Sequence, residues 1–239
     1  MAEAIDACWL EQIEADVPTV NQWLSAREES RLATMRFNKR RTEWRLGRWT
    51  AKCAVASYLN LPLDISSLRD IEIQAAPSGA PEVCLFNQDT AVSLSISHRA
   101  GKALCVVGLS RATLGCDLEL VESRDQSFVA DFFTTNEQKL INRSATDERP
   151  MLATLLWSAK ESALKALQVG LRLDTTSIEV RPADVPWKAA EYSREDVCTD
   201  WSPLSLRVAG EHILRGCWRC ADNMVRTVVL GPLQRQRWS

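Results

Sequence analysis

Three acidic side chains are spaced so that they could share one divalent cation. Asp117 and Glu119 lie two residues apart in TLGCDLEL (113–120), an expected strand, so both carboxylates point to the same face. Like charges on one face repel each other unless a cation neutralises them, and Mg²⁺ prefers such oxygen ligands. Glu161, in an expected helix, would add a third carboxylate. The alternative for the Asp117–Glu119 pair is the solvated face of an edge strand.

Two lysines stand beside the third carboxylate. Glu161 and Lys165 lie four residues apart in a helix expected over 151–170, so they share one face, and Lys160 directly precedes Glu161. An ammonium group is a compact point charge that suits a phosphate. The pattern therefore indicates phosphate binding beside the cation. The alternative is a solvated helix face with an ion pair worth about 0.3–0.5 kcal/mol.

A third candidate is SISHRAGK (95–102), which follows an alternating strand. Ser97 and His98 lie at the end of that strand, close to Gly101 and Lys102. A strand-end loop with donors and a glycine can hold an anionic group. Taken alone, a histidine in such a loop is more often incidental.

Helices and strands of ordinary length are expected to position these residues. A long helix is expected from the apolar spacing over 28–60, ended by Pro62, and a helix or helix pair over 128–141. The helix over 151–170 ends at Gly170. Strands are expected at 71–74, 83–86, 91–97, 103–110 and 113–120, with a turn at 76–81 and further short strands after 170.

The sequence repeats itself. Trp-Thr-Ala-Lys at 49–52 returns as Trp-Ser-Ala-Lys at 157–160, and each copy continues as helix, loop and strand. This pattern predicts an internal duplication, the alternative being chance similarity of amphipathic helices. The fold class is then α+β, a pseudodimer of two similar halves, 1–112 and 113–239. Each half has a long helix packed on a small, mostly antiparallel sheet, and the cleft between the halves is the expected ligand site.

Composition excludes several classes of protein. The 239 residues carry a net charge of −2, with 46% hydrophobic and 25% charged residues, which argues against collagen, disorder, a coiled-coil rod and bulk binding of nucleic acid. No apolar run reaches membrane-spanning length, and the N-terminus lacks a basic signal region, so a cytoplasmic protein is expected. Eight cysteines show no regular framework, and Cys217 with Cys220 lacks the second pair that a zinc site needs.

The motifs together resemble one family. GCDLE (115–119) followed by WSAKESALK (157–165) resembles the signature of the 4′-phosphopantetheinyl transferases, and EESRLATMRF, RLGRWTAK, PSGAP and SISH arrive in the order typical of that family. The length is similar to the longer, monomeric branch that activates surfactin-type peptide synthetases. The resemblance implies transfer of the phosphopantetheine arm of coenzyme A to a serine of an apo acyl or peptidyl carrier protein. The other product is adenosine 3′,5′-bisphosphate.

The resemblance also implies roles for the acidic group. Asp117, Glu119 and Glu161 match the ligands of Mg²⁺, for which Mn²⁺ is a possible substitute. Glu161, or a water on the metal, would help to deprotonate the carrier serine. Lys165 matches a pyrophosphate-binding lysine, and Lys160 matches the motif lysine beside the glutamate, assigned here to coenzyme A. Glu161 falls where the first copy has Cys53, so a single active site is expected.

Further positions match coenzyme A contacts of the family: Arg31, Arg48, Gly79, Pro81, Ser97 and His98. One position departs from the family pattern, because Ala80 stands where the family usually has a lysine. Arg99 or Arg41 could supply the missing cation.

Carrier proteins are usually acidic around the modified serine, so a basic and apolar docking surface is expected near 128–143. Phe132, Phe133, Lys139 and Arg143 are the candidates, with core packing as the alternative for both phenylalanines. Two other functions stay open at this point. One is a non-catalytic module that binds coenzyme A or another nucleotide, and the other is a different Mg²⁺-dependent phosphoryl enzyme. The sequence has no P-loop or Rossmann glycine pattern.

Overall fold

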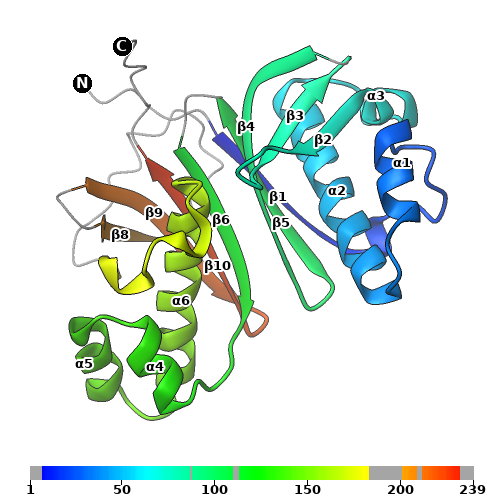
Figure 1. The fold of residues 1–239 in the computed structure, drawn as a ribbon. Coiled ribbons are helices and arrows are strands. Elements are labelled where there is room, and N and C mark those ends of the chain that lie inside the picture. Colours follow the sequence, from blue (N-terminus) through cyan, green and yellow to red (C-terminus); the bar gives the residue numbers. More distant parts are fainter. Residues whose placement is uncertain (1–6, 87, 110–112, 183–200, 209–211, 232–239) are drawn as a thin grey trace.

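The computed structural model describes residues 7–86, 88–109, 113–182, 201–208 and 212–231 (Figure 1). The first five strands, β1 (Ala7–Ile13), β2 (Ile71–Ala75), β3 (Pro81–Leu85), β4 (Gln88–Arg99) and β5 (Lys102–Leu109), form one sheet in the order β1-β5-β4-β3-β2. The other five, β6 (Thr113–Leu120), β7 (Ile178–Pro182), β8 (Ser202–Val208), β9 (His212–Ala221) and β10 (Met224–Gly231), form a second sheet in the order β6-β10-β9-β8-β7. All neighbouring strands are antiparallel.

The two sheets have the same connectivity. In each, the first strand leads into helices, a four-stranded meander follows, and the last strand returns to pair with the first. The helices are α1 (Ala26–Ala33), α2 (Asn38–Tyr58) and α3 (Ile65–Asp70) in the first half, and α4 (Gln126–Phe132), α5 (Thr135–Arg143) and α6 (Arg149–Ala166) in the second. The long helices α2 and α6 each pack on the sheet of their own half. This confirms the α+β pseudodimer predicted from the repeated sequence.

The helix expected over 28–60 is two helices. Thr34 is the C-cap of α1, and Phe37, whose backbone is extended (φ −98°, ψ 127°), is the N-cap of α2. The chain leaves helical geometry between these two residues. Capping explains the start of α1, because the Ser25 hydroxyl accepts from the Glu28 amide and the Glu28 carboxylate accepts from the Ser25 amide. Thr134 begins α5 with the same reciprocal pair of bonds to Glu137.

A buried lysine–glutamate pair fixes each long helix to the short helix beside it. In the second half, Lys160 Nζ lies 2.8 Å from Glu137 and 2.7 Å from the carbonyl oxygens of both Thr175 and Ile178. Glu137 also accepts from the Val180 amide on β7. In each half the glutamate of the pair is also the one that caps the short helix. The lysine is therefore repeated because it holds the long helix against the short one.

The first half repeats this arrangement. Lys52 pairs with Glu28 and donates to the carbonyl oxygens of Trp23 and Leu68, and Glu28 accepts from the Ile73 amide on β2. Lys52 and Lys160 are both fully buried. The Lys of the Trp-x-Ala-Lys repeat therefore belongs to the interior of each half.

The halves share an apolar interface bordered by ion pairs. Leu104 and Val106 of β5 pack with Cys116 and Leu118 of β6 in a single buried cluster. At its border the Arg226 guanidinium donates two hydrogen bonds to the Glu11 carboxylate, from β10 to β1. β4 also runs beside β6 at the centre of the molecule (Figure 1). Within the described part of the chain, no helix is long and apolar enough to cross a lipid bilayer.

Candidate active site

The acidic group begins at a close approach of β6 to α6. Gly115 lies so near the helix that a Cβ atom there would be 1.8 Å from the carbonyl oxygen of Ser162. Only glycine allows this spacing, which explains the glycine two residues before Asp117. The contact brings β6, with Asp117 and Glu119, against the helix that carries Glu161 and Lys165.

Asp117 is buried and held through one of its two carboxylate oxygens. Oδ1 accepts hydrogen bonds of 2.8 Å from both Lys165 Nζ and Ser97 Oγ. Oδ2 is buried and finds no hydrogen-bond partner among the described residues. Lys165 also donates to the Cys116 carbonyl at 3.0 Å. Burial alone would lower the pKa of Lys165, but the charge of Asp117, its hydrogen bond to Lys165 and the neighbouring Cys116 and Glu161 together outweigh burial. The net shift is upward, which keeps the ammonium charged.

Glu119 and Glu161 are half-buried near Asp117. Burial raises the pKa of both carboxyls, and the negative charge of Asp117 raises each further. Arg99 and Arg124 oppose this at Glu119, where their nitrogens lie 3.7 Å and 3.9 Å from Oε2. The negative charge of Asp117 therefore acts on both glutamates, on Glu119 along β6 and on Glu161 across to α6.

The donor chemistry of this group fits a hard divalent cation. Three carboxylates can supply oxygen ligands, and Asp117 Oδ2 is a buried acceptor that meets no donor among the residues the structure describes. In the described part of the chain, no three acidic, cysteine or histidine side chains come close enough together to form a complete metal site. The match between this group and a divalent cation therefore depends on the oxygen donors and on the unpartnered Asp117 Oδ2. Lys165, Arg99 and Arg124 offset part of the negative charge of the carboxylates.

The first half reaches this group through β4. Besides the bond from Ser97 to Asp117, Ser95 Oγ accepts from the Cys116 amide at 3.0 Å. His98 follows at the exposed end of β4, close to Gly47 of α2. Partial burial lowers the pKa of His98, and the charge of Lys165 lowers it further. The structure thus brings Ser97 into contact with Asp117, whereas His98 lies against α2 and within electrostatic reach of Lys165.

Other expected coenzyme A residues lie farther out on the first half. The Arg48 guanidinium lies over the Trp44 ring, 5.1 Å from its centroid. Burial lowers the pKa of Arg48, and the positive charge of Arg31 on α1 adds to the lowering. Gly79 (φ 88°) lies in the exposed turn between β2 and β3, and Pro81 begins β3. The structure does not bring these four residues into contact with Asp117.

The prediction that Lys160 contacts coenzyme A is not supported by its position. The side chain is fully buried, and its three donors point to Glu137 and to two backbone carbonyls. No N–H remains for a phosphate. The candidates to replace the missing lysine at Ala80 are also engaged. Arg99 pairs with acidic side chains of the second half, and Arg41 donates to two carbonyl oxygens at the end of α1.

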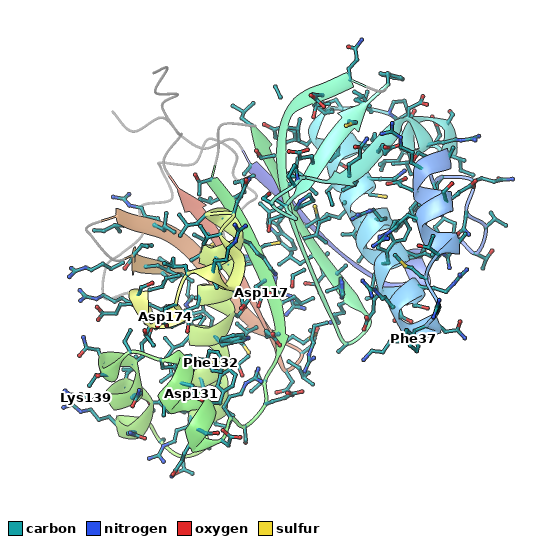
Figure 2. All side chains as sticks on the ribbon, in the orientation of Figure 1. Phe37, Asp117, Asp131, Phe132, Lys139 and Asp174 are labelled. Carbon is teal, nitrogen blue, oxygen red and sulfur yellow. The ribbon has the colours of Figure 1, made fainter. Side chains whose placement is uncertain are left out.

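The expected carrier surface divides into interior and exterior residues. Phe133 is buried, and its ring lies 5.7 Å from Lys160 Nζ, so core packing explains it. Phe132 packs on Trp157 with ring centroids 5.2 Å apart, whereas Lys139 and Arg143 are exposed on α5. Figure 2 shows Asp117 between the two halves and Lys139 on the outer side of the second half.

Sequence reasoning missed two residues around the site: Arg124, which lies beside Glu119, and Ser95, which contacts Cys116 and none of the three carboxylates. Ser95 carries a recognisable signal, because it lies two residues before Ser97 and shares its face of the strand. Arg124 follows β6 in a loop without periodicity. Its approach to Glu119 depends on tertiary structure and leaves no local pattern.

Comparison with known proteins identifies the segment that carries the acidic group. Residues 113–215 match the family model described as the 4′-phosphopantetheinyl transferase superfamily. No curated protein matches the chain. The matched segment includes β6 and α6 and with them Asp117, Glu119, Glu161 and Lys165.

The chain is also similar over about half its length to solved holo-(acyl-carrier-protein) synthases. That from Bacillus anthracis str. Ames, in complex with CoA (3′,5′-ADP), is 23% identical, with 45% of this chain and 97% of that chain covered and a TM-score of 0.38. The Thermotoga maritima enzyme is 17% identical, with 51% and 64% covered and a TM-score of 0.37. The Helicobacter pylori enzyme, in complex with coenzyme A, is 24% identical, with 44% and 99% covered and a TM-score of 0.34.

Proposed function

We propose that the protein transfers the 4′-phosphopantetheine arm of coenzyme A to a serine of an apo carrier protein, because residues 113–215 match the family model described as the 4′-phosphopantetheinyl transferase superfamily. The released product is adenosine 3′,5′-bisphosphate. One observation carries the proposal. Asp117, inside the matched segment, is held by Lys165 through Oδ1 while its buried Oδ2 has no partner among the described residues.

The chain's own groups support a proton transfer and a charge-neutralising role. The carrier serine oxygen forms a bond to the phosphorus of the phosphopantetheine arm as the pyrophosphate linkage breaks, and the serine proton must go to a base. Glu161 is proposed for this role because burial and the charge of Asp117 raise the pKa of its carboxyl. Lys165 stays protonated beside Asp117 and is proposed to stabilise the leaving bisphosphate.

Asp117, Glu119 and Glu161 would hold Mg²⁺, with Mn²⁺ as a possible substitute. A bound divalent cation would neutralise the charge that develops on the phosphoryl oxygens. Arg31, Arg48 and His98 are proposed for coenzyme A, and the first half (1–112) would supply most of those contacts.

We further propose that apo acyl or peptidyl carrier proteins dock along α5. Lys139 and Arg143 are exposed there, and basic residues complement an acidic carrier surface. A single chain is proposed to suffice, because both halves of the pseudodimer are already joined.

Mass spectrometry of intact carrier proteins tests the proposal. The protein is incubated with coenzyme A, Mg²⁺ and a panel of apo carriers, and the expected result is a gain of one phosphopantetheine group that EDTA abolishes. Glu161→Gln should slow the transfer about 10²–10⁴-fold. Glu148→Gln is the matched control, because it removes a carboxylate that makes no capping bond at the start of the same helix.

Two results would contradict the proposal. Transfer by Glu161→Gln at the rate of the parent would remove the proposed base. Coenzyme A binding without transfer to any carrier would favour the non-catalytic binding module.

A further inference from the structure

The hydroxyl of Ser97 is committed to Asp117 in this structure. Its Oγ donates to Asp117 Oδ1 over 2.8 Å, and Ser97 is only 8% exposed. A serine hydroxyl has a single hydrogen to donate. While that hydrogen is on Asp117, Ser97 has no donor for a phosphate of coenzyme A, the role that family resemblance implies for it.

The contact also determines which carboxylate oxygen is free. Ser97 and Lys165 approach the same oxygen, Oδ1, from opposite halves of the molecule, since Ser97 lies on β4 and Lys165 on α6. Two donors on one oxygen restrict the rotation of the carboxylate. Oδ2 is consequently the oxygen left buried and unpartnered among the described residues.

A second contact keeps β4 in place without touching the carboxylate. Ser95 Oγ accepts from the Cys116 amide at 3.0 Å, and Cys116 Sγ lies 3.1 Å from the Ser95 carbonyl oxygen. Ser95 and Ser97 share one face of β4, and both are buried against β6. The strand is therefore attached at Ser95, and Ser97 can act specifically on Asp117.

We propose that Ser97 is a positioning residue, through which the first half orients Asp117 so that Oδ2 is presented to a divalent cation. The inference rests on the proposed function of the acidic group. It assigns Ser97 to the orientation of a cation ligand and not to coenzyme A. Groups that orient metal ligands typically change metal affinity about 10–100-fold when they are removed.

Metal binding measured without any carrier protein tests this directly. Mn²⁺ is titrated into the full chain, and free Mn²⁺ is followed by electron paramagnetic resonance. Ser97→Ala should weaken Mn²⁺ binding about 10–100-fold. Ser97→Thr, which keeps the hydroxyl, should restore most of the affinity. Ser95→Ala is the matched control, because it loses a bond between the same two strands and should leave Mn²⁺ affinity within about 3-fold of the parent.

A second titration separates positioning from coenzyme A recognition. Affinities for coenzyme A and 3′-dephospho-coenzyme A are measured by calorimetry without metal. Their ratio should be the same in Ser97→Ala and the parent, since Ser97 does not reach the 3′-phosphate under this proposal. If Ser97→Ala weakened the binding of coenzyme A but not that of 3′-dephospho-coenzyme A, Ser97 would belong to the phosphate site. That result would overturn the inference.

Other outcomes overturn it as well. Unchanged Mn²⁺ affinity in Ser97→Ala, equal weakening in Ser95→Ala, or no Mn²⁺ binding by the parent each contradicts a positioning role. The transfer assay is scored separately. A parent that binds Mn²⁺ through a Ser97-dependent site but modifies no carrier would refute the proposed function and leave the positioning role standing.

Discussion

Replacing Lys160 by methionine tests whether this lysine is a structural residue or a coenzyme A ligand. The side chain is fully buried, and Nζ lies 2.7–2.8 Å from Glu137, the Thr175 carbonyl and the Ile178 carbonyl. Methionine keeps the unbranched shape of the stem but removes the charge and all three donors. Glu137 would then be a buried carboxylate without its cation, and two carbonyl oxygens would lose their partner.

The size of the effect follows from what is left unpaired. Breaking a buried ion pair by removing one partner typically costs about 3–5 kcal/mol. A domain is stable by only about 5–15 kcal/mol, so this loss is large. The double variant Lys160→Met/Glu137→Gln removes both charges, and the introduced amide still offers an oxygen to the Val180 N–H that Glu137 binds at 2.7 Å. It should be more stable than Lys160→Met alone by about 1–3 kcal/mol.

Urea unfolding and coenzyme A titration give the two readouts. Lys160→Met should unfold at a much lower urea concentration, and the fraction that is folded should bind coenzyme A with the affinity of the parent. The reasoning is refuted by the opposite pair of results, parent-like unfolding together with weaker coenzyme A binding. Those results would place Lys160 in the ligand site, as its neighbour Glu161 and the family motif first indicated.

Three further predictions concern stability. Lys52→Met should lower the free energy of unfolding by about 3–5 kcal/mol, as Lys160→Met should, because Lys52 has the same kinds of partner. A loss under about 1 kcal/mol in urea unfolding would refute the equivalence of the two lysines. Gly115→Ala should destabilise the protein by about 3 kcal/mol or more, since the added Cβ would overlap the α6 backbone. In Gly47→Ala the added Cβ would meet only atoms at 3.6 Å or beyond, so this variant should be neutral or more stable by up to about 1 kcal/mol. Equal melting temperatures for the two glycine variants would show that β6 can move away from α6. Arg226→Met should lose about 1.5–3 kcal/mol with its bonds to Glu11 between the halves, and an unchanged urea midpoint would contradict this.

The fold could be predicted largely because local patterns determine it. Alternation over 113–120 gave β6 with its observed bounds, and the repeated Trp-x-Ala-Lys predicted the duplication that the two equal strand orders confirm. The break between α1 and α2 was missed because the chain departs from helical geometry over only a few residues, at Thr34 to Phe37, where no proline or glycine marks the end. Local periodicity continues across such a gap.

The candidate site was predictable only where its members share an element. Asp117 with Glu119, and Glu161 with Lys165, follow from strand and helix periods, and the structure brings both pairs together. The role predicted for Lys160 was inferred from its neighbour in sequence, Glu161, which faces the acidic group. Lys160 lies one residue earlier on the helix and points to Glu137 instead. A step of about 100° around the helix separates a residue facing the site from one facing the interior.

The same geometry explains why the acidic group occurs once in a molecule built from two equivalent halves. Counted from the hairpin that closes each sheet, Leu10 and Gln12 of β1 occupy the positions of Asp117 and Glu119 on β6. The first half thus lacks both strand carboxylates, although it keeps its buried ion pair. Its contribution comes from β4, where Ser95 and Ser97 reach across to Cys116 and Asp117. Both halves of the pseudodimer therefore keep the same scaffold, but their polar contacts differ. The second half carries the carboxylates, and the first half contacts one of them, Asp117, and holds it in orientation.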